Sequence, residues 1–139
     1  MTSIRITGFN HVAVPISDRR KTLPFYRDVL GLKVIPSMVD TPTVIWTQLE
    51  NGAMVHPCEP NPEGQPAVYH VAYEVADFDA AVKALEEAGI EILRQGVRHD
   101  GQRFLFVNDP DGNRVELATA AVEAPANRVV DEWGHTREV

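Results

Sequence analysis

Two stretches of this chain share one pattern and decide its fold: residues 9–35 are FNHVAVPISDRRKTLPFYRDVLGLKVI, and residues 68–92 are VYHVAYEVADFDAAVKALEEAGIEI. Each stretch contains a His-Val-Ala triplet, at His11 and at His70, and an aspartate seven residues after that histidine. The two histidines are 59 residues apart. Self-similarity at a fixed offset indicates that one structural unit occurs twice.

The repeat continues beyond these stretches. Sixty residues separate three features of the first half from their counterparts, pairing Trp46 with Phe106, Asn51-Gly52 with Asp111-Gly112, and His56 with Glu116. In each half an apolar, β-branched segment predicts a strand, a helical pattern follows, and three more strand-like runs come after it. The Asn-Gly and Asp-Gly pairs are typical of hairpin turns between the last two strands. The predicted order is therefore β-α-β-β-β, twice.

The two helices have recognisable ends. In the second half, Asp77 or Asp79 can cap the helix, which ends at Gly89. In the first half, Thr22 as the cap would place Pro24 in the first turn, where a missing N–H costs little.

The chain length of 139 residues fits one domain, and a hydrophobic content of 44% is enough for a core. We predict a single α+β domain over residues 1–139, in which two βαβββ modules form a curved mixed sheet around a cleft, with the helices outside. The first module covers about residues 5–58, a linker rich in proline covers 59–66, the second module covers about 67–118, and a C-terminal tail covers 119–139.

The tail has no counterpart in the first half. Residues 126–134 predict a short helix that presents Val129, Val130 and Trp133, which a monomer would have difficulty burying. We therefore expect a homodimer or a lid over the cleft. His135, in the charged end of the chain, is expected to be disordered.

Charge and cysteine content exclude several classes of function. The net charge of -7 disfavours binding to nucleic acid and to anionic membrane surfaces. Cys58 is the single cysteine, which excludes an intramolecular disulfide and a cysteine-rich zinc site. We find no signal-peptide pattern and no apolar run close to the roughly 20 residues of a membrane span. The expected location is the cytoplasm, and the expected partner is a small-molecule substrate.

Four repeat-equivalent positions carry metal-binding side chains. His11 matches His70, and His56 matches Glu116, each in a strand-like run. Imidazole and carboxylate groups bind Zn²⁺, Fe²⁺, Mn²⁺ or Ni²⁺ without thiolates. A buried Glu116 without a cation or a metal ion as partner would also be energetically expensive. Together these positions predict a site for one divalent metal ion.

The two repeat stretches and a third segment, FLFVNDPDGNRVEL at residues 104–117, resemble the vicinal oxygen chelate superfamily. This superfamily includes glyoxalase I, methylmalonyl-CoA epimerase, fosfomycin-resistance enzymes, bleomycin-resistance proteins and extradiol dioxygenases. The resemblance covers residues 8–118 and implies paired βαβββ modules, with a metal ion held by His11, His70 and Glu116. It also implies a substrate that chelates the ion through adjacent oxygens. His56 occupies a position that is often Glu or Gln in the lyases and epimerases.

Ring cleavage by an extradiol-type dioxygenase is our leading interpretation of the chemistry. The segment from His99 to Glu116 is similar to the motif of those enzymes, except that Phe106 replaces a tyrosine. His56 lies 14 residues before His70, a spacing similar to that of their acid/base histidine. Fe²⁺ would then be the metal, and His56 and His99 would be the catalytic residues.

Two alternatives remain open at this point. In a glyoxalase-like lyase or epimerase, His56 would be a fourth ligand, and the nitrogen-rich site would suit Zn²⁺, Ni²⁺ or Mn²⁺. In a non-catalytic binder of the bleomycin-resistance type, the cleft would sequester a drug without a metal ion. The presence of His11, His70 and Glu116 argues against that second alternative.

Overall fold

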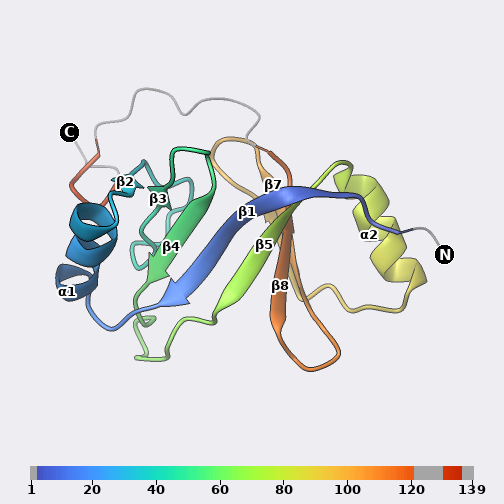
Figure 1. Cartoon of the computed structure of the whole chain (residues 1–139). Helices are drawn as coiled ribbons and strands as arrows, with labels where there is room; N and C mark the ends of the chain where they lie inside the picture. Colours follow the sequence, from blue (N-terminus) through green and yellow to red (C-terminus); the bar gives the residue numbers. More distant parts are fainter. Residues whose placement is uncertain (1–2, 121–129, 136–139) are drawn as a thin grey trace. The chain divides into compact units, whose positions relative to one another are not determined.

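A computed structural model describes residues 3–120 and 130–135 (Figure 1). The chain has a mixed α+β fold and follows the predicted β-α-β-β-β order twice. Its elements are β1 (Ile6–Pro15), α1 (Arg19–Pro24), the π-helical turn η1 (Phe25–Val29), β2 (Lys33–Val34), β3 (Thr47–Gln48), β4 (Met54–Cys58), β5 (His70–Val75), α2 (Phe78–Glu87), β6 (Arg94–Val97), β7 (Arg103–Asn108) and β8 (Arg114–Ala118). In the described part of the chain, no helix is long and apolar enough to cross a membrane.

The elements form two compact units, and strand β1 contributes to both. One unit combines the described residues up to Asn10 with residues 70–120, and its strand order is β5-β8-β7-β6. The other combines His11–Tyr69 with the end of the chain, and its strand order is β2-β3-β4-β1. The sequence repeat therefore corresponds to two four-stranded arrangements of the same order.

The strand registers confirm the equivalence of the two halves. Strand β1 pairs in parallel with β4, and Ala13 lies opposite His56. Strand β5 pairs in parallel with β8, and Ala72 lies opposite Glu116. In both units the position two residues after the histidine of the His-Val-Ala triplet faces the second repeat-equivalent residue. His56 and Glu116 thus occupy the same place in their units.

Helix α2 covers a core formed with the strands of its own unit. The side chain of Asp77 accepts a hydrogen bond from the backbone N–H of Ala80 at 3.0 Å, which confirms one of the two predicted caps. The buried cluster joins one face of the helix to strands β5, β7 and β8 and consists of Val75, Phe78, Ala81, Leu85, Leu105, Val107 and Leu117. This packing fixes β8, the strand that carries Glu116.

Helix α1 starts earlier than predicted. Its cap is Asp18, whose side chain accepts a hydrogen bond from the N–H of Arg20, so the assignment of Thr22 as the cap was wrong. Pro24 consequently falls in the last turn of α1 and cannot donate a backbone hydrogen bond. The chain then widens into η1, where the N–H of Leu30 reaches the carbonyl of Phe25 at 2.9 Å.

Residues 130–135 pack against their own unit. Trp133 lies against the guanidinium of Arg19, whose Cζ is 5.3 Å from the ring centroid. Nε2 of His135 lies 2.9 Å from the carbonyl oxygen of Val44, so the expectation that His135 is disordered was wrong. Residues 130–135 form a bridge and a turn instead of the predicted helix, and residues 126–129 lie outside the described part. Homodimerisation remains a prediction.

Gly134 provides a test of this packing. Its φ is +79°, and a Cβ atom at this position would collide with the backbone carbonyl oxygen of Ile35. Gly52 is the matched control, because its φ is +91° and nothing lies within 4 Å of a Cβ placed there. We expect Gly52→Ala to lower the free energy of unfolding by about 1 kcal/mol, and Gly134→Ala to lower it by about 2–3 kcal/mol because the collision is added. Urea denaturation measures both, and equal costs would contradict the packing of this turn.

Candidate metal centre

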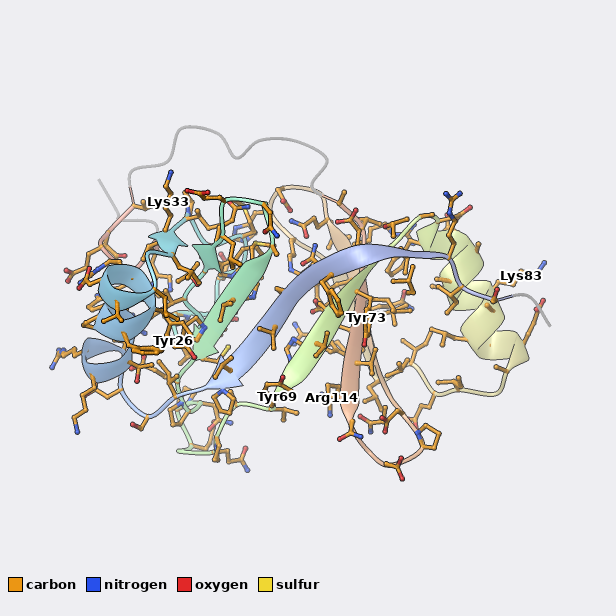
Figure 2. The ribbon with its side chains drawn as sticks, viewed as in Figure 1. Tyr26, Lys33, Tyr69, Tyr73, Lys83 and Arg114 are labelled. Atoms are coloured by element: carbon orange, nitrogen blue, oxygen red, sulfur yellow. The ribbon has the colours of Figure 1, made fainter. Side chains whose placement is uncertain are left out.

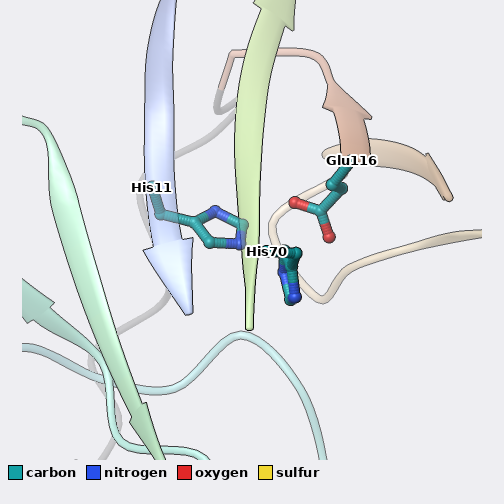
Figure 3. Close-up of side chains that lie close together, drawn as sticks. All are labelled: His11, His70 and Glu116. Carbon is teal, nitrogen blue, oxygen red and sulfur yellow. The ribbon is translucent and has the colours of Figure 1, made fainter. Parts of the chain in front are cut away.

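Three potential ligands converge, as Figure 3 shows: His11 from β1, His70 from β5 and Glu116 from β8. Each offers one ligand atom, and these atoms all lie within 4.8 Å of one another. A first-row divalent ion binds imidazole nitrogen and carboxylate oxygen at about 2.0–2.2 Å. Small side-chain movements are therefore enough to bring all three atoms to one ion. The donor set of two imidazoles and one carboxylate also suits such an ion.

Glu116 is the most deeply buried of the three. Its side chain is 1% exposed, and Oε1 accepts a hydrogen bond from Nη2 of Arg98 at 2.8 Å. Burial raises the pKa of Glu116 to about 7, while the positive charge of Arg98 and its hydrogen bond oppose that increase. The guanidinium therefore compensates the charge of Glu116 only in part. A divalent ion would favour the ionised carboxylate further.

His56 lies beside His11 but outside the group of three. Its ring stacks on the ring of His11, with a centroid distance of 4.0 Å and an interplanar angle of 22°. On its other side it stacks with Trp46 at 4.2 Å and 28°. Trp46 and His11 are 6.5 Å apart, so the histidine sits between them. Both His56 and Trp46 are buried, and the stack holds the orientation of His11.

His99 and Arg98 have opposite environments. His99, predicted to be catalytic, is exposed in the turn between β6 and β7, and it is not part of the ligand group. Its neighbour Arg98 is buried and contacts Glu116. Sequence reasoning missed Arg98, although a signal existed. A carboxylate expected to be buried needs a cationic partner, and the arginine that directly follows strand β6 is a candidate.

Phe106, which replaces the tyrosine of the extradiol motif, makes an apolar contact with His70. The ring of Phe106 packs edge-on against the ring of His70, with centroids 5.1 Å apart and an angle of 89°. Tyr73, labelled in Figure 2, instead packs with Phe9 at 5.3 Å and lies against the core cluster under α2. Adjacent side chains of a strand alternate between its two faces, so Tyr73 does not share the face of His70. Tyr73 is therefore not placed to supply the phenol hydroxyl that Phe106 lacks.

Cys58 is a buried structural residue. Its thiol donates to the carbonyl oxygen of His56 at 3.2 Å. Burial raises its pKa to about 11, so the thiolate is scarce at neutral pH. This environment does not favour a nucleophile or a metal ligand.

Comparison with known proteins identifies the family. The sequence pattern of the Glyoxalase/Bleomycin resistance protein/Dioxygenase superfamily matches residues 8–117. An ethylmalonyl-CoA/methylmalonyl-CoA epimerase from Cereibacter sphaeroides is 33% identical over 127 residues, which cover 78% of this chain and 92% of that protein. Glutathione transferase FosA from Serratia marcescens is 30% identical over 129 residues, which cover 86% and 85% of the two chains.

A solved structure has the same fold. The crystal structure of methylmalonyl-CoA epimerase from Mycobacterium tuberculosis superposes with a TM-score of 0.70 at 21% identity, over 90% of this chain and 93% of that chain. The chain therefore belongs to the Glyoxalase/Bleomycin resistance protein/Dioxygenase superfamily, as the resemblance predicted. These relatives are an epimerase and a thiol transferase, so they favour the epimerase alternative over our leading interpretation as a ring-cleaving dioxygenase.

The raised pKa of Glu116 has a measurable effect on the metal-free protein. Between pH 4.5 and about 7 the carboxyl group ionises in the unfolded chain while it is still protonated in the folded one. The free energy of unfolding should therefore fall as the pH rises through this window, by about 3 kcal/mol for a shift of this size. Glu116→Gln cannot ionise and should gain stability relative to the wild type over the same window. Urea denaturation in the presence of a chelator measures the difference, and a difference independent of pH would contradict the raised pKa.

Proposed function

We propose that this protein is a divalent-metal-dependent enzyme of the epimerase type. It would remove a proton from a carbon next to a carbonyl group and return it, on a small substrate that chelates the ion through adjacent oxygens. The observation that carries this proposal is the convergence of His11, His70 and Glu116 within 4.8 Å. An ion bound to them would polarise the substrate oxygens and stabilise the developing enolate.

Two observations support epimerisation over ring cleavage. The relative from Cereibacter sphaeroides, an ethylmalonyl-CoA/methylmalonyl-CoA epimerase, aligns over 92% of its length. In addition, Phe106 packs against His70 where the extradiol motif has a tyrosine, and its ring has no hydroxyl group to donate to a bound catechol. The epimerase proposal needs no such donor.

The stack geometry argues against His56 as a fourth ligand. An imidazole nitrogen donates its lone pair in the plane of its own ring, so two imidazoles that shared one ion would both have to point at it in their ring planes. The ring of His56 lies nearly parallel to that of His11, with an angle of 22° and a centroid distance of 4.0 Å. Two such planes do not share a point within about 2.1 Å of both rings. We propose that His56 is instead the residue that exchanges a proton with the substrate.

Proton exchange in D₂O tests this function. The probe is a methylmalonyl thioester, and NMR follows the loss of the signal of the proton next to the carbonyl. We expect no exchange after metal removal and recovery with Co²⁺, Mn²⁺ or Zn²⁺. Glu116→Ala should lose both metal and exchange, because one of three ligands is absent. His56→Gln should keep the metal and lose about 10²–10⁴-fold in rate.

Lys83→Gln is the control for these variants, because Lys83 is 77% exposed on helix α2. Three results would contradict the proposal. Oxygen uptake and ring opening with Fe²⁺ and a catechol would restore the dioxygenase interpretation. Addition of a thiol to an epoxide, without proton exchange, would indicate a transferase. Tight binding of a drug of the bleomycin type that is unchanged in Glu116→Ala would indicate a non-catalytic, metal-independent binding protein.

A further inference from the structure

The turn between β6 and β7 is held by its own buried polar groups. The N–H of Arg98 donates to the carbonyl of Gln102 at 2.7 Å, and the N–H of Gly101 donates back to the carbonyl of Arg98 at 3.0 Å. Inside the turn, the carboxylate of Asp100 accepts hydrogen bonds from the backbone and from the side chain of Gln102. Asp100 and Gln102 are both buried, so these bonds are shielded from water and fix the backbone that carries Arg98.

The guanidinium of Arg98 is held by two contacts. Its Cζ lies 4.7 Å from the ring centroid of Phe104, and its Nη2 lies 2.8 Å from Oε1 of Glu116. The ring of Phe104 can approach β6 because residue 96 is a glycine, where a Cβ would lie 3.0 Å from the ring. With 6% exposure, the guanidinium is shielded from competing solvent. Its orientation toward Glu116 is thus built into the fold.

We propose that Arg98 is a positioning residue for the metal centre: it holds one oxygen of Glu116 and leaves the other oxygen to bind the ion. This inference rests on the ligand set of the proposed function. Outer groups that hydrogen-bond a ligating carboxylate fix its orientation, and their loss commonly lowers metal affinity about 10–100-fold. Arg98 also adds a positive charge beside the ion.

Co²⁺ binding tests the role of Arg98 without any substrate. Affinity is measured by titration, and the visible spectrum of bound Co²⁺ reports its coordination. In Arg98→Met we expect the dissociation constant for Co²⁺ to rise about 10–100-fold. We also expect the spectrum of bound Co²⁺ to change, because the hydrogen bond from Arg98 to Oε1 of Glu116 is lost and the carboxylate can reorient. Arg98→Lys keeps the cation but lacks the planar pair of donors, so it should restore part of the affinity.

Arg94→Met is the matched control. Arg94 also lies over the ring of Phe104, at 5.7 Å, but it is exposed and no described contact joins it to Glu116. Its variant should bind Co²⁺ like the wild type. A structural effect on the Phe104 region alone would affect both arginine variants, whereas positioning of Glu116 affects only Arg98.

The outcomes separate this inference from the proposed function. Wild-type protein that binds no Co²⁺ would overturn both. Wild-type affinity and an unchanged spectrum in both Arg98→Met and Arg98→Lys would overturn the inference and leave the ligand set intact. If Arg98→Met does not fold, Arg98→Lys decides on the same two readouts: a weaker, spectrally altered site supports positioning, and a site identical to the wild type contradicts it.

Discussion

A carboxylate buried away from water is the constraint on which the site depends. Transfer of an isolated charge into a protein interior is so costly that such groups are paired, metal-bound or neutral. Glu116 is 1% exposed, and the guanidinium of Arg98 lies 2.8 Å from its carboxylate. Arg98, carried by its hydrogen-bonded turn, places a positive charge against this one group. Without the guanidinium of Arg98, burial would favour the protonated form of this carboxyl group still more strongly.

The two halves of the chain show how one plan can yield two roles. Trp46 and His56 in one unit correspond to Phe106 and Glu116 in the other. The imidazole stacks between two rings, whereas the carboxylate pairs with a guanidinium. The positions match in the sequence repeat, and the side chains at them differ. The repeat thus gives His56 and Glu116 matching positions in the two units. Because the side chains differ, Glu116 is a candidate metal ligand, whereas His56 stacks beside one.

The sequence was sufficient to predict the features that depend on local pattern. The repeat predicted the element order and drew attention to four positions, His11, His56, His70 and Glu116. The family resemblance singled out His11, His70 and Glu116, whose ligand atoms lie within 4.8 Å of one another. Asp77 was one of two predicted caps of the second helix. The repeat did not predict Arg98, because a buried ion pair across 18 residues depends on how a turn closes and not on periodicity. The widened turn after Pro24 was missed for a similar reason. Its conformation follows from an early cap at Asp18, and several nearby residues could have served as the cap.

Strand β1 has a consequence for how the chain acquires its structure. Its first residues pack with the half that begins at His70, and the rest of it packs with the half that the end of the chain completes. Neither unit is therefore a continuous stretch of polypeptide. During synthesis the first module emerges before the turn at Gly134 and His135, which contacts Ser37 and Val44. Contacts this distant in sequence slow folding and favour a late, concerted closure over module-by-module assembly on the ribosome.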